Sequence, residues 1–305
     1  RARLADTSRP VPMKQAIQKA NVLIEALPHI QRFRGDTVVV KFGGSSMDNP
    51  ETVRGILEDI AFMSCVGMRP VIVHGGGKSI NARLKQQGLQ ATFVQGLRVT
   101  DAATMKIVEQ VLNREVNPQL VTALNDLGCK ARGIHGEDII AVRRHTAEDP
   151  DTGRVLDWGF VGAITHVDVL PVKAYLEADI TPVITPLGAD PAKQIHNINA
   201  DAAAAGLAER LQARKLVFLS DVPGLLSDPA DRSSLMSTLR LSEVENLIER
   251  GIIGGGMLPK ISGALKALKA GVRKTHIIDA ALPHSLLLEL FTDQGIGTEI
   301  VNDSL

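Results

Sequence analysis

Short β-branched runs alternate with longer segments in which apolar residues recur at helical spacing along most of this chain. The short runs predict strands over residues 37–42, 70–74, 180–185, 215–220 and 275–279. The segments between them predict helices over residues 51–66, 78–87, 101–127, 168–178, 200–213, 242–250 and 260–270. Several strands are followed at once by a Gly or Asp turn and then by a helix. That order is typical of an α/β fold with a mainly parallel sheet and helices on both faces.

An amphipathic helix is predicted ahead of this pattern, over residues 13–34, and residues 1–12 read as a loose arm. Its apolar stripe either packs on the core of the chain or offers a surface to a partner, and the sequence leaves both open. Residues 143–163 are polar and rich in turn formers, which predicts a β-hairpin, and residues 184–198 suggest a hinge between two lobes.

Composition narrows the function classes. The 305 residues carry 34 basic and 34 acidic side chains, so the formal net charge is zero, and no basic stripe is interleaved with aromatics. This disfavours a nucleic-acid partner. No run of about 18 apolar residues occurs, so no membrane span is expected. The two cysteines are far apart, which favours a reducing compartment. We therefore expect the protein to be located in the cytoplasm, or in a plastid if an upstream targeting segment was removed.

Two lysines stand beside glycine-rich loops near opposite ends of the chain. Lys41 ends an apolar run and precedes Gly43-Gly44, whereas Lys260 closes the loop 254–260, which begins with three glycines. A third cluster, residues 75–77, follows the strand 70–74. Backbone N–H groups of such loops and lysine ammonium groups can hold an oxyanion. This arrangement favours phosphoryl transfer, although a tight turn with an exposed lysine is the alternative for Lys41. Neither a Walker A motif nor Gly-x-Gly-x-x-Gly after a first strand is present.

Three further polar residues suit a binding site. Arg98 lies in a loop ahead of a helix that Thr100 or Asp101 can cap, and it is either a surface arginine or a clamp for a carboxylate. Asn197 and Asp201 precede an alanine-rich helix. Asp201 is either a helix cap or a carboxylate that holds the two lysines in place. His74 reads more naturally as a buried, hydrogen-bonded residue than as a base.

Taken together, these segments resemble the amino acid kinase family, and within it the members that act on N-acetyl-L-glutamate. The matching segments follow the order of the family and cover roughly residues 13–302. They are Val39-Val40-Lys41-Phe42-Gly43-Gly44, His74-Gly75-Gly76-Gly77, Gly96-Leu97-Arg98-Val99-Thr100-Asp101, Asn197-Ile198-Asn199-Ala200-Asp201, Ser220-Asp221-Val222-Pro223-Gly224 and Gly255-Gly256-Met257-Leu258-Pro259-Lys260.

The resemblance implies a three-layer αβα sandwich preceded by an N-terminal helix. It implies an arm and oligomerisation helix over residues 1–34, an N-terminal lobe over 35–190 for the acetylated amino acid and dimerisation, and a C-terminal lobe over 191–305 for ATP. It also implies transfer of the γ-phosphoryl group of ATP to the side-chain carboxylate, early in arginine synthesis. Mg²⁺ would travel on the ATP phosphates, so no protein ligand is assigned to it.

The site roles come from the resemblance residue by residue. Lys41 and Lys260 would stabilise the moving phosphoryl group, Asp201 would orient them, and Gly44 and Gly76 would donate backbone hydrogen bonds. The residues expected to bind the acetylated amino acid are Gly76, Gly77, Arg98 and Asn197. The residues expected to bind the nucleotide are Lys215, Ser220, Asp221, Gly224, Gly256 and Lys260.

The N-terminal helix further resembles that of the arginine-inhibited, hexameric members, which are trimers of dimers. The resemblance places arginine at His276, Glu289 and Gly295. However, Ile278-Asp279-Ala280-Ala281 stands where the family usually shows Ile-Asp-Gly-Arg, which leaves that inhibitor pocket undecided. A PII-type signalling protein is a further partner that the sequence does not decide.

Two other functions compete with this one. Aspartokinase is the nearest enzymatic alternative, but it lacks the triple-glycine segment and the segment 96–101. A non-catalytic arginine-sensing module belongs to a different class, and the presence of both lysines and Asp201 argues against it.

Overall fold

An eight-stranded sheet forms the centre of the computed structural model, which describes residues 13–148, 153–228, 230–292 and 295–303. Its strand order is β12-β14-β13-β11-β1-β2-β8-β5, and only β13 and β14 pair antiparallel. The strands are β1 (Thr37–Phe42), β2 (Arg69–His74), β5 (Ala131–Ile134), β8 (Thr181–Ile184), β11 (Lys215–Ser220), β12 (Thr238–Arg240), β13 (Lys274–Asp279) and β14 (Thr298–Val301). The mainly parallel sheet predicted from the sequence is confirmed.

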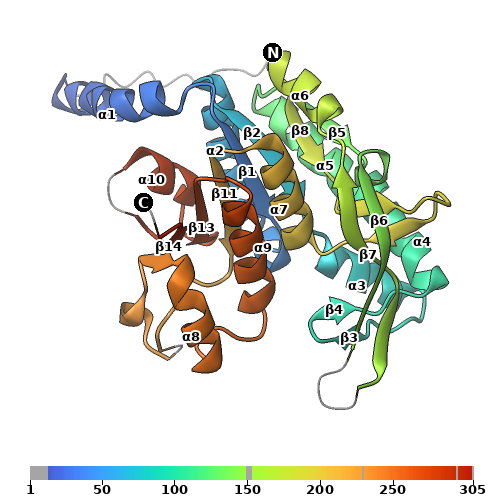
Figure 1. Cartoon of the computed structure of the whole chain (residues 1–305). Helices are drawn as coiled ribbons and strands as arrows, with labels where there is room; N and C mark the ends of the chain where they lie inside the picture. Colours follow the sequence, from blue (N-terminus) through green and yellow to red (C-terminus); the bar gives the residue numbers. More distant parts are fainter. Residues whose placement is uncertain (1–12, 149–152, 229, 293–294, 304–305) are drawn as a thin grey trace.

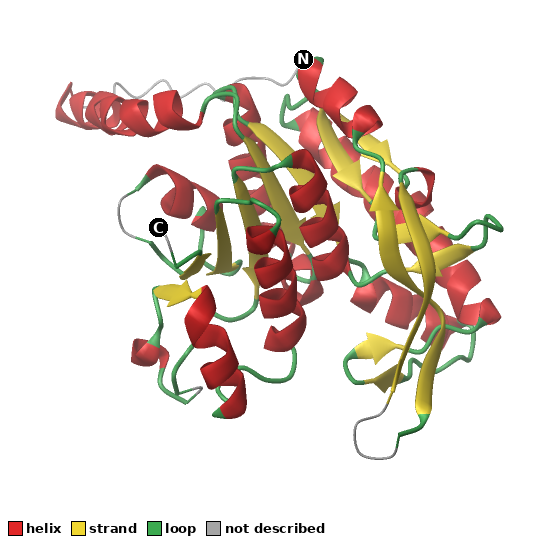
Figure 2. Ribbon diagram, viewed as in Figure 1, coloured by secondary structure: helices red, strands yellow, loops and turns green. Residues whose placement is uncertain are grey.

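Helices cover both faces of this sheet, as Figure 2 shows. One face carries α6 (Leu170–Glu177), α7 (Ala200–Leu211), α8 (Val244–Glu249) and α9 (Met257–Lys269). The other face carries α2 (Pro50–Cys65), α3 (Gly77–Gln86), α4 (Ala102–Val111), α5 (Asn117–Asp126) and α10 (Ser285–Phe291). The molecule therefore has three layers.

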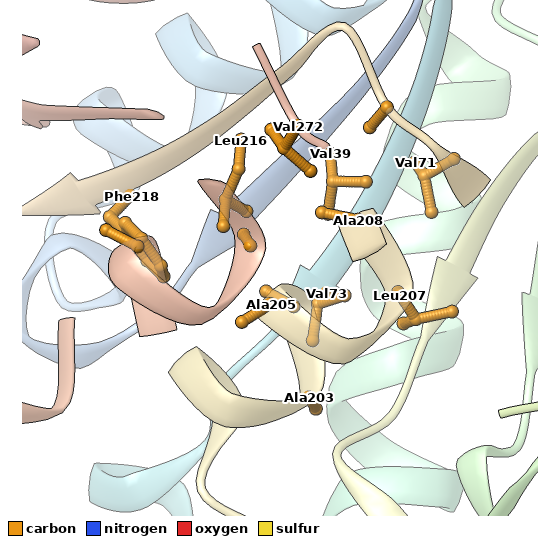
Figure 3. Close-up of a cluster of buried hydrophobic side chains, with 14 of the residues drawn as sticks. Val39, Val71, Val73, Ala203, Ala205, Leu207, Ala208, Leu216, Phe218 and Val272 are labelled. Atoms are coloured by element: carbon orange, nitrogen blue, oxygen red, sulfur yellow. The ribbon is translucent and has the colours of Figure 1, made fainter. Parts of the chain in front are cut away.

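The alternation of side chains along β1 explains why two separate cores form. Val39 joins the core under α7 and α9, whereas Val38 and Val40 join the core on the opposite face. Since successive strand residues point to opposite faces, an uninterrupted apolar run is what a strand covered on both sides requires. Figure 3 shows the first core, where Ala205 and Ala208 of α7 lie close to the strands. Small alanine side chains let α7 approach the sheet.

Two smaller β units lie beside the large sheet. The strands β6 (Ile140–Glu148), β7 (Val155–Val167), β9 (Leu187–Ala189) and β10 (Ile195–Asn197) pair in a closed ring. The short strands β3 (Phe93–Val94) and β4 (Leu97–Arg98) form a hairpin of their own. The hairpin predicted over residues 143–163 is confirmed as β6 and β7, although residues 149–152 lie outside the described part of the chain.

The helix predicted over residues 101–127 is confirmed from Ala102 to Asp126, but it is not α-helical throughout. A π-helical stretch, Leu112–Val116, separates α4 from α5. Continuous helical periodicity does not reveal such a bulge, because it inserts extra chain without changing the apolar character of the face. The prediction of a helix from residue 260 is also late, since α9 begins at Met257.

Helix α1 (Met13–Phe33) extends away from the rest of the molecule (Figure 1). Among its residues only Phe33 is buried. The stripe residues Ile17, Leu23 and Ile24 are 51%, 64% and 67% exposed. The alternative in which this stripe packs on the core of the same chain is therefore wrong, and the predicted arm, residues 1–12, lies outside the described residues. None of the described helices is long and apolar enough to cross a membrane.

Candidate active site

Two ammonium groups and one carboxylate from three elements meet at the edge of the sheet. Lys41 Nζ lies 3.0 Å from Asp201 Oδ1, and Lys260 Nζ lies 3.2 Å from Asp201 Oδ2. Lys41 comes from β1, Asp201 from the first turn of α7 and Lys260 from the first turns of α9. All three side chains are largely buried. The sequence places these residues far apart, and the parallel fold brings them together.

The start of α7 explains how Asp201 reaches the lysines. The side chain of Asn199 caps the helix by accepting hydrogen bonds from the N–H groups of Asp201 and Ala202, at 2.9 and 3.1 Å. Because Asn199 supplies the cap, the carboxylate of Asp201 remains available to the two lysines. The interpretation of Asp201 as the cap of α7 is therefore wrong.

The electrostatics of Asp201 follow from this geometry. Burial on its own raises the pKa of the carboxyl, but the charges of Lys41 and Lys260 outweigh it and hold the pKa below its ordinary value. A lysine near a helix N-terminus, as Lys260 is in α9, is also disfavoured by the helix dipole unless an acid compensates. The carboxylate and the two ammonium groups together carry a net charge of +1.

The loops after β1 and β2 approach each other beside this cluster. The N–H of Gly75 donates a 2.7 Å hydrogen bond to the carbonyl of Phe42. A Cβ on Gly43 would lie 3.0 Å from Gly75 Cα, so neither loop has room for a side chain at this contact. Gly76 then precedes α3, and no side chain caps that helix. Its first N–H groups are consequently available to an anion.

A cavity of about 340 Å³ opens beside Lys41 and Asp201. It brings together most of the residues predicted for the catalytic and acid-binding roles, namely Lys41, Gly44, Gly76, Gly77, Arg98, Asn197 and Asp201. Arg98 is only 7% exposed, and its Nη2 donates to the carbonyl of Gly77 at 3.2 Å. Its Nη1 is buried and has no hydrogen-bond partner among the described residues. An unpartnered guanidinium nitrogen in a cavity is suited to an acidic ligand.

His74 lies next to this site but is fully buried and hydrogen-bonded at both ring nitrogens. Nδ1 lies 2.8 Å from the carbonyl of Gly75, and Nε2 lies 3.1 Å from Nδ2 of Asn117. Since a carbonyl accepts and an amide nitrogen donates, the ring is neutral with its proton on Nδ1. Burial lowers the pKa of His74 from 6.5 to about 4. The prediction that His74 is a buried, hydrogen-bonded residue is confirmed.

The residues predicted for the nucleotide do not all gather in one place. Ser220 and Asp221 lie at the carboxyl end of β11, with Gly224 in the loop that follows, and Gly256 directly precedes α9. Lys215 is the first residue of β11, five positions before Ser220, which is about 16 Å along an extended strand. The expectation that Lys215 lines the nucleotide site is therefore corrected: its side chain faces a second cavity at the opposite end of the strand.

That second cavity, of about 500 Å³, contains His276, Glu289 and Gly295 together with Lys215. His276 Nδ1 lies 2.6 Å from Glu289 Oε1, and Lys274 Nζ lies 2.8 Å from Glu299 Oε2. Burial lowers the pKa of Lys215 to about 8. The last turns of α1 contribute His29, Arg32 and Phe33 to the lining. The structure thus brings the three predicted arginine-site residues together at the base of α1.

The sequence did not identify several residues that shape the first cavity. Phe93 and Leu112 line it, and the guanidinium carbon of Arg98 lies 4.7 Å from the centre of the Phe93 ring. Phe93 pairs with Arg98 across the hairpin, so a hairpin signal at Gln95-Gly96 could have linked them. Leu112 begins the π-helical stretch and carried no such signal.

Comparisons with known proteins point to the same family that the sequence segments resemble. The model of the amino acid kinase family matches residues 36–279. Acetylglutamate kinase from Syntrophomonas wolfei is 48% identical over 288 residues, which cover 94% of this chain and 99% of the relative. Acetylglutamate kinase from Symbiobacterium thermophilum is 46% identical over 290 residues, with the same coverage.

Solved structures are similar as well. N-acetylglutamate synthase from Neisseria gonorrhoeae, complexed with coenzyme A and N-acetyl-glutamate, superposes with a TM-score of 0.80 at 29% identity. The match covers 94% of this chain but only 64% of the synthase. Carbamate kinase from Giardia lamblia bound to AMP-PNP has a TM-score of 0.62 at 17% identity and shows a common fold.

Proposed function

This chain belongs to the amino acid kinase family, and from that premise we propose that it transfers the γ-phosphoryl group of ATP to the side-chain carboxylate of N-acetyl-L-glutamate. The observation that carries the proposal is the meeting of Lys41 and Lys260 on Asp201 beside a cavity that contains Arg98. The names of the two relatives given above, which match nearly the full chain, support N-acetyl-L-glutamate as the acceptor. The product is an acyl phosphate of arginine biosynthesis.

The acid is proposed to lie in the first cavity. Arg98 would bind one carboxylate through Nη1, because that buried nitrogen otherwise lacks a partner among the described residues. Asn197, which lines the same cavity, would bind the other polar groups of the acid together with the N–H groups of Gly76 and Gly77. The second carboxylate of the acid would then point toward Lys41. A carboxylate is ionised at neutral pH, so the reaction needs no general base, and the neutral, buried His74 is not required.

ATP is proposed to approach from the carboxyl end of β11, over Ser220, Asp221, Gly224 and Gly256. Mg²⁺ would arrive on the ATP phosphates and supply charge neutralisation there. Lys41 and Lys260 lie on either side of Asp201 and would stabilise the charge that develops on the transferring phosphoryl group. The N–H groups of Gly44 and Gly76 would donate to its oxygens. Asp201 would hold both ammonium groups in position without receiving the phosphoryl group.

Regulation and assembly are part of the proposal. We place inhibitory arginine in the second cavity, where Glu289 offers a carboxylate for a guanidinium and Lys215 offers an ammonium for a carboxylate. The exposed stripe of α1 supports a homo-hexamer, a trimer of dimers in which these helices interlace. The bacterial relatives favour the cytoplasm as its compartment.

An acyl phosphate assay tests the proposed reaction. The purified chain with MgATP, N-acetyl-L-glutamate and hydroxylamine should form a hydroxamate at a rate that depends on both substrates. Aspartate and carbamate serve as alternative acceptors under the same conditions. Turnover with aspartate but not with N-acetyl-L-glutamate would overturn the proposed substrate assignment. Failure to form an acyl phosphate from any of these acceptors would overturn the proposed reaction.

A further inference from the structure

The hairpin that carries Arg98 is too small to hold its own position. Its strands β3 and β4 contain two residues each, and they are joined by Gln95 and Gly96 at φ of 48° and 78°. Two consecutive residues in the left-handed backbone region are typical of a tight two-residue turn, and such a turn fixes the strand register. A hairpin of two residue pairs is not stable alone in water. The place of Arg98 therefore depends on what the hairpin docks against.

The long hairpin β6–β7 provides that docking surface at Trp158. The indole Nε1 of Trp158 donates a 2.9 Å hydrogen bond to the carbonyl of Val94 in β3. On the other side of Arg98, the N–H of Thr100 donates to the carbonyl of Trp158 at 2.8 Å, and the N–H of Phe160 donates to the carbonyl of Thr100 at 2.7 Å. Trp158 is thus hydrogen-bonded to Val94, which precedes Arg98 in the hairpin, and to Thr100, which follows it.

The backbones of β7 and Thr100 can approach closely because the residue after Trp158 is a glycine. Gly159 has a φ of 75°, and a Cβ there would lie 2.3 Å from the carbonyl oxygen of Thr100. The backbones of β7 and of Thr100, two residues after β4, are therefore in close contact, which fixes this end of the hairpin against β7. Trp158 itself is 1% exposed, and the ring of His145 covers it at 4.9 Å between centroids.

Arg98 is in turn oriented by the hairpin and by the loop after β2. The guanidinium stacks over Phe93, its partner across the hairpin, and Nη2 is held by the carbonyl of Gly77. These contacts leave Nη1 without a partner in the described chain. A displacement of β3 would move the Phe93 ring and with it the direction of Nη1.

We propose that Trp158 is a positioning residue for substrate binding, which fixes the Arg98 hairpin through its hydrogen bond to Val94 so that Arg98 Nη1 meets the carboxylate of the acid. The proposal rests on the proposed function, because it assumes that the acid binds in the first cavity. Trp158 does not line that cavity and acts only through the hairpin. Its influence belongs to binding of the acid and not to the phosphoryl-transfer step.

Kinetics of Trp158→Phe test the proposal, since this variant keeps an aromatic ring at a buried position and removes the N–H donor together with part of the ring volume. We expect KM for N-acetyl-L-glutamate to rise about fivefold, the effect of one lost hydrogen bond. Turnover at saturation and KM for ATP should stay within about twofold of the wild type. Arg144→Ala is the matched control, because it removes an exposed ion pair with Asp157 on the same hairpin and should leave all three constants unchanged.

A double-mutant cycle separates positioning from general stability. In an Arg98→Ala background, Trp158→Phe should change KM for the acid less than twofold, because the group being positioned is absent. The same fivefold rise in both backgrounds would mean that Trp158 acts on the fold alone and would overturn the proposal. An unchanged KM in the single variant, in an enzyme that makes acyl phosphate, would overturn it while leaving the proposed function intact.

Fluorescence of the unmodified chain gives a test that needs no variant. Trp158 is the only tryptophan in the sequence, so all indole emission comes from this contact. N-acetyl-L-glutamate without ATP should change the emission saturably, with a midpoint near its KM. Absence of any change while the same sample turns over would contradict the proposed coupling between Arg98 and Trp158.

Discussion

Lys41 and Lys260 are 219 positions apart in the sequence, yet their ammonium groups contact opposite oxygens of one carboxylate, at 3.0 and 3.2 Å. Two buried cations so close together would repel each other in a medium of low dielectric constant. Asp201 makes their proximity stable, and the cluster keeps one net positive charge. A site built in this way is prepared for an additional anion before the anion arrives.

Loss of either lysine should therefore reduce turnover more than binding. Lys41→Ala and Lys260→Ala should each lower kcat about 10²-fold or more, the usual effect of losing one contact to charge that develops in the transition state. KM for N-acetyl-L-glutamate should change much less, since the acid is proposed to bind through Arg98. Steady-state assays of hydroxamate formation measure both constants.

Lys269→Ala is the control for this pair, because Lys269 is exposed and lies on the same helix as Lys260. It should retain wild-type kcat. Near-native turnover in both active-site variants would rule out the roles assigned to the two lysines.

Removal of Arg98 should have the opposite kinetic signature. Arg98→Ala should raise KM for N-acetyl-L-glutamate about 10-fold to 100-fold, because a hydrogen bond to a charged group contributes about 1.5–3 kcal/mol. KM for ATP should stay unchanged. Arg54→Ala removes an arginine that is exposed on α2 and should leave both values unaffected. A KM for the acid equal to that of the wild type would exclude Arg98 from the substrate site.

The parallel sheet and the pairing of the two lysine loops could be predicted from the sequence for one physical reason. Buried strands leave uninterrupted apolar runs, and parallel strands bring their carboxyl ends to one edge of the sheet, where the glycine loops then meet. Lys41 could be placed at this edge in this way, whereas Arg98 and Asp201 were assigned to the same site through the resemblance to the amino acid kinase family. Asn199 was not identified as the cap of α7, because the carboxylate of Asp201 offers the same local signal.

Other parts of the site depend on packing that local patterns do not encode. Lys215 was assigned to the nucleotide site by resemblance, but it lies at the amino end of its strand, whereas Lys41 lies near the carboxyl end of β1, so Lys215 faces the second cavity. Trp158 is 60 residues from Arg98 and contacts the hairpin only because β7 runs beside it. The π-helical stretch that places Leu112 in the cavity leaves the apolar periodicity of its helix unbroken.

His74 predicts a pH dependence of stability. The folded chain does not protonate this ring until pH falls to about 4, whereas the unfolded chain takes up the proton near 6.5. The unfolded state therefore binds more protons between these values, and stability falls as pH decreases through this window. His74→Gln should remove about 2 kcal/mol of the loss in unfolding free energy that the wild type shows between pH 7 and pH 5.

Urea titrations at the two pH values measure this difference. His74→Gln is expected to be less stable than the wild type at pH 7, since it disturbs the hydrogen bond to Asn117, but its stability should depend less on pH. An identical pH dependence in variant and wild type would show that His74 does not control acid sensitivity.

The second cavity predicts a separation of inhibition from catalysis. Glu289→Gln removes the charge proposed to pair with the guanidinium of arginine and should raise the concentration for half-inhibition at least tenfold, with kcat unchanged. Inhibition curves at fixed substrate concentrations measure the effect. Glu245→Gln, at an exposed position of α8, is the control. Equal sensitivity of Glu289→Gln and the wild type would place the inhibitor elsewhere.

The exposed stripe of α1 predicts the oligomeric state. Ile17 and Ile24 lie seven positions apart, so they share one face of the helix, and both are more than half exposed in the single chain. If α1 helices from different dimers pack along this face, Ile17→Glu with Ile24→Glu would bury two carboxylates from each helix at each contact. Burial of unpaired charge costs several kcal/mol, so we expect the hexamer to dissociate into dimers.

Light scattering after size-exclusion chromatography determines the mass of each species. The matched control is Gln15→Glu with Val22→Glu, which adds the same two charges at the same spacing on the opposite face of α1 and should remain hexameric. Because α1 also contributes Arg32 and Phe33 to the second cavity, the dissociated variant should respond less to arginine while its kcat is retained. A hexamer with full arginine sensitivity in the Ile17→Glu and Ile24→Glu variant would contradict assembly through this stripe.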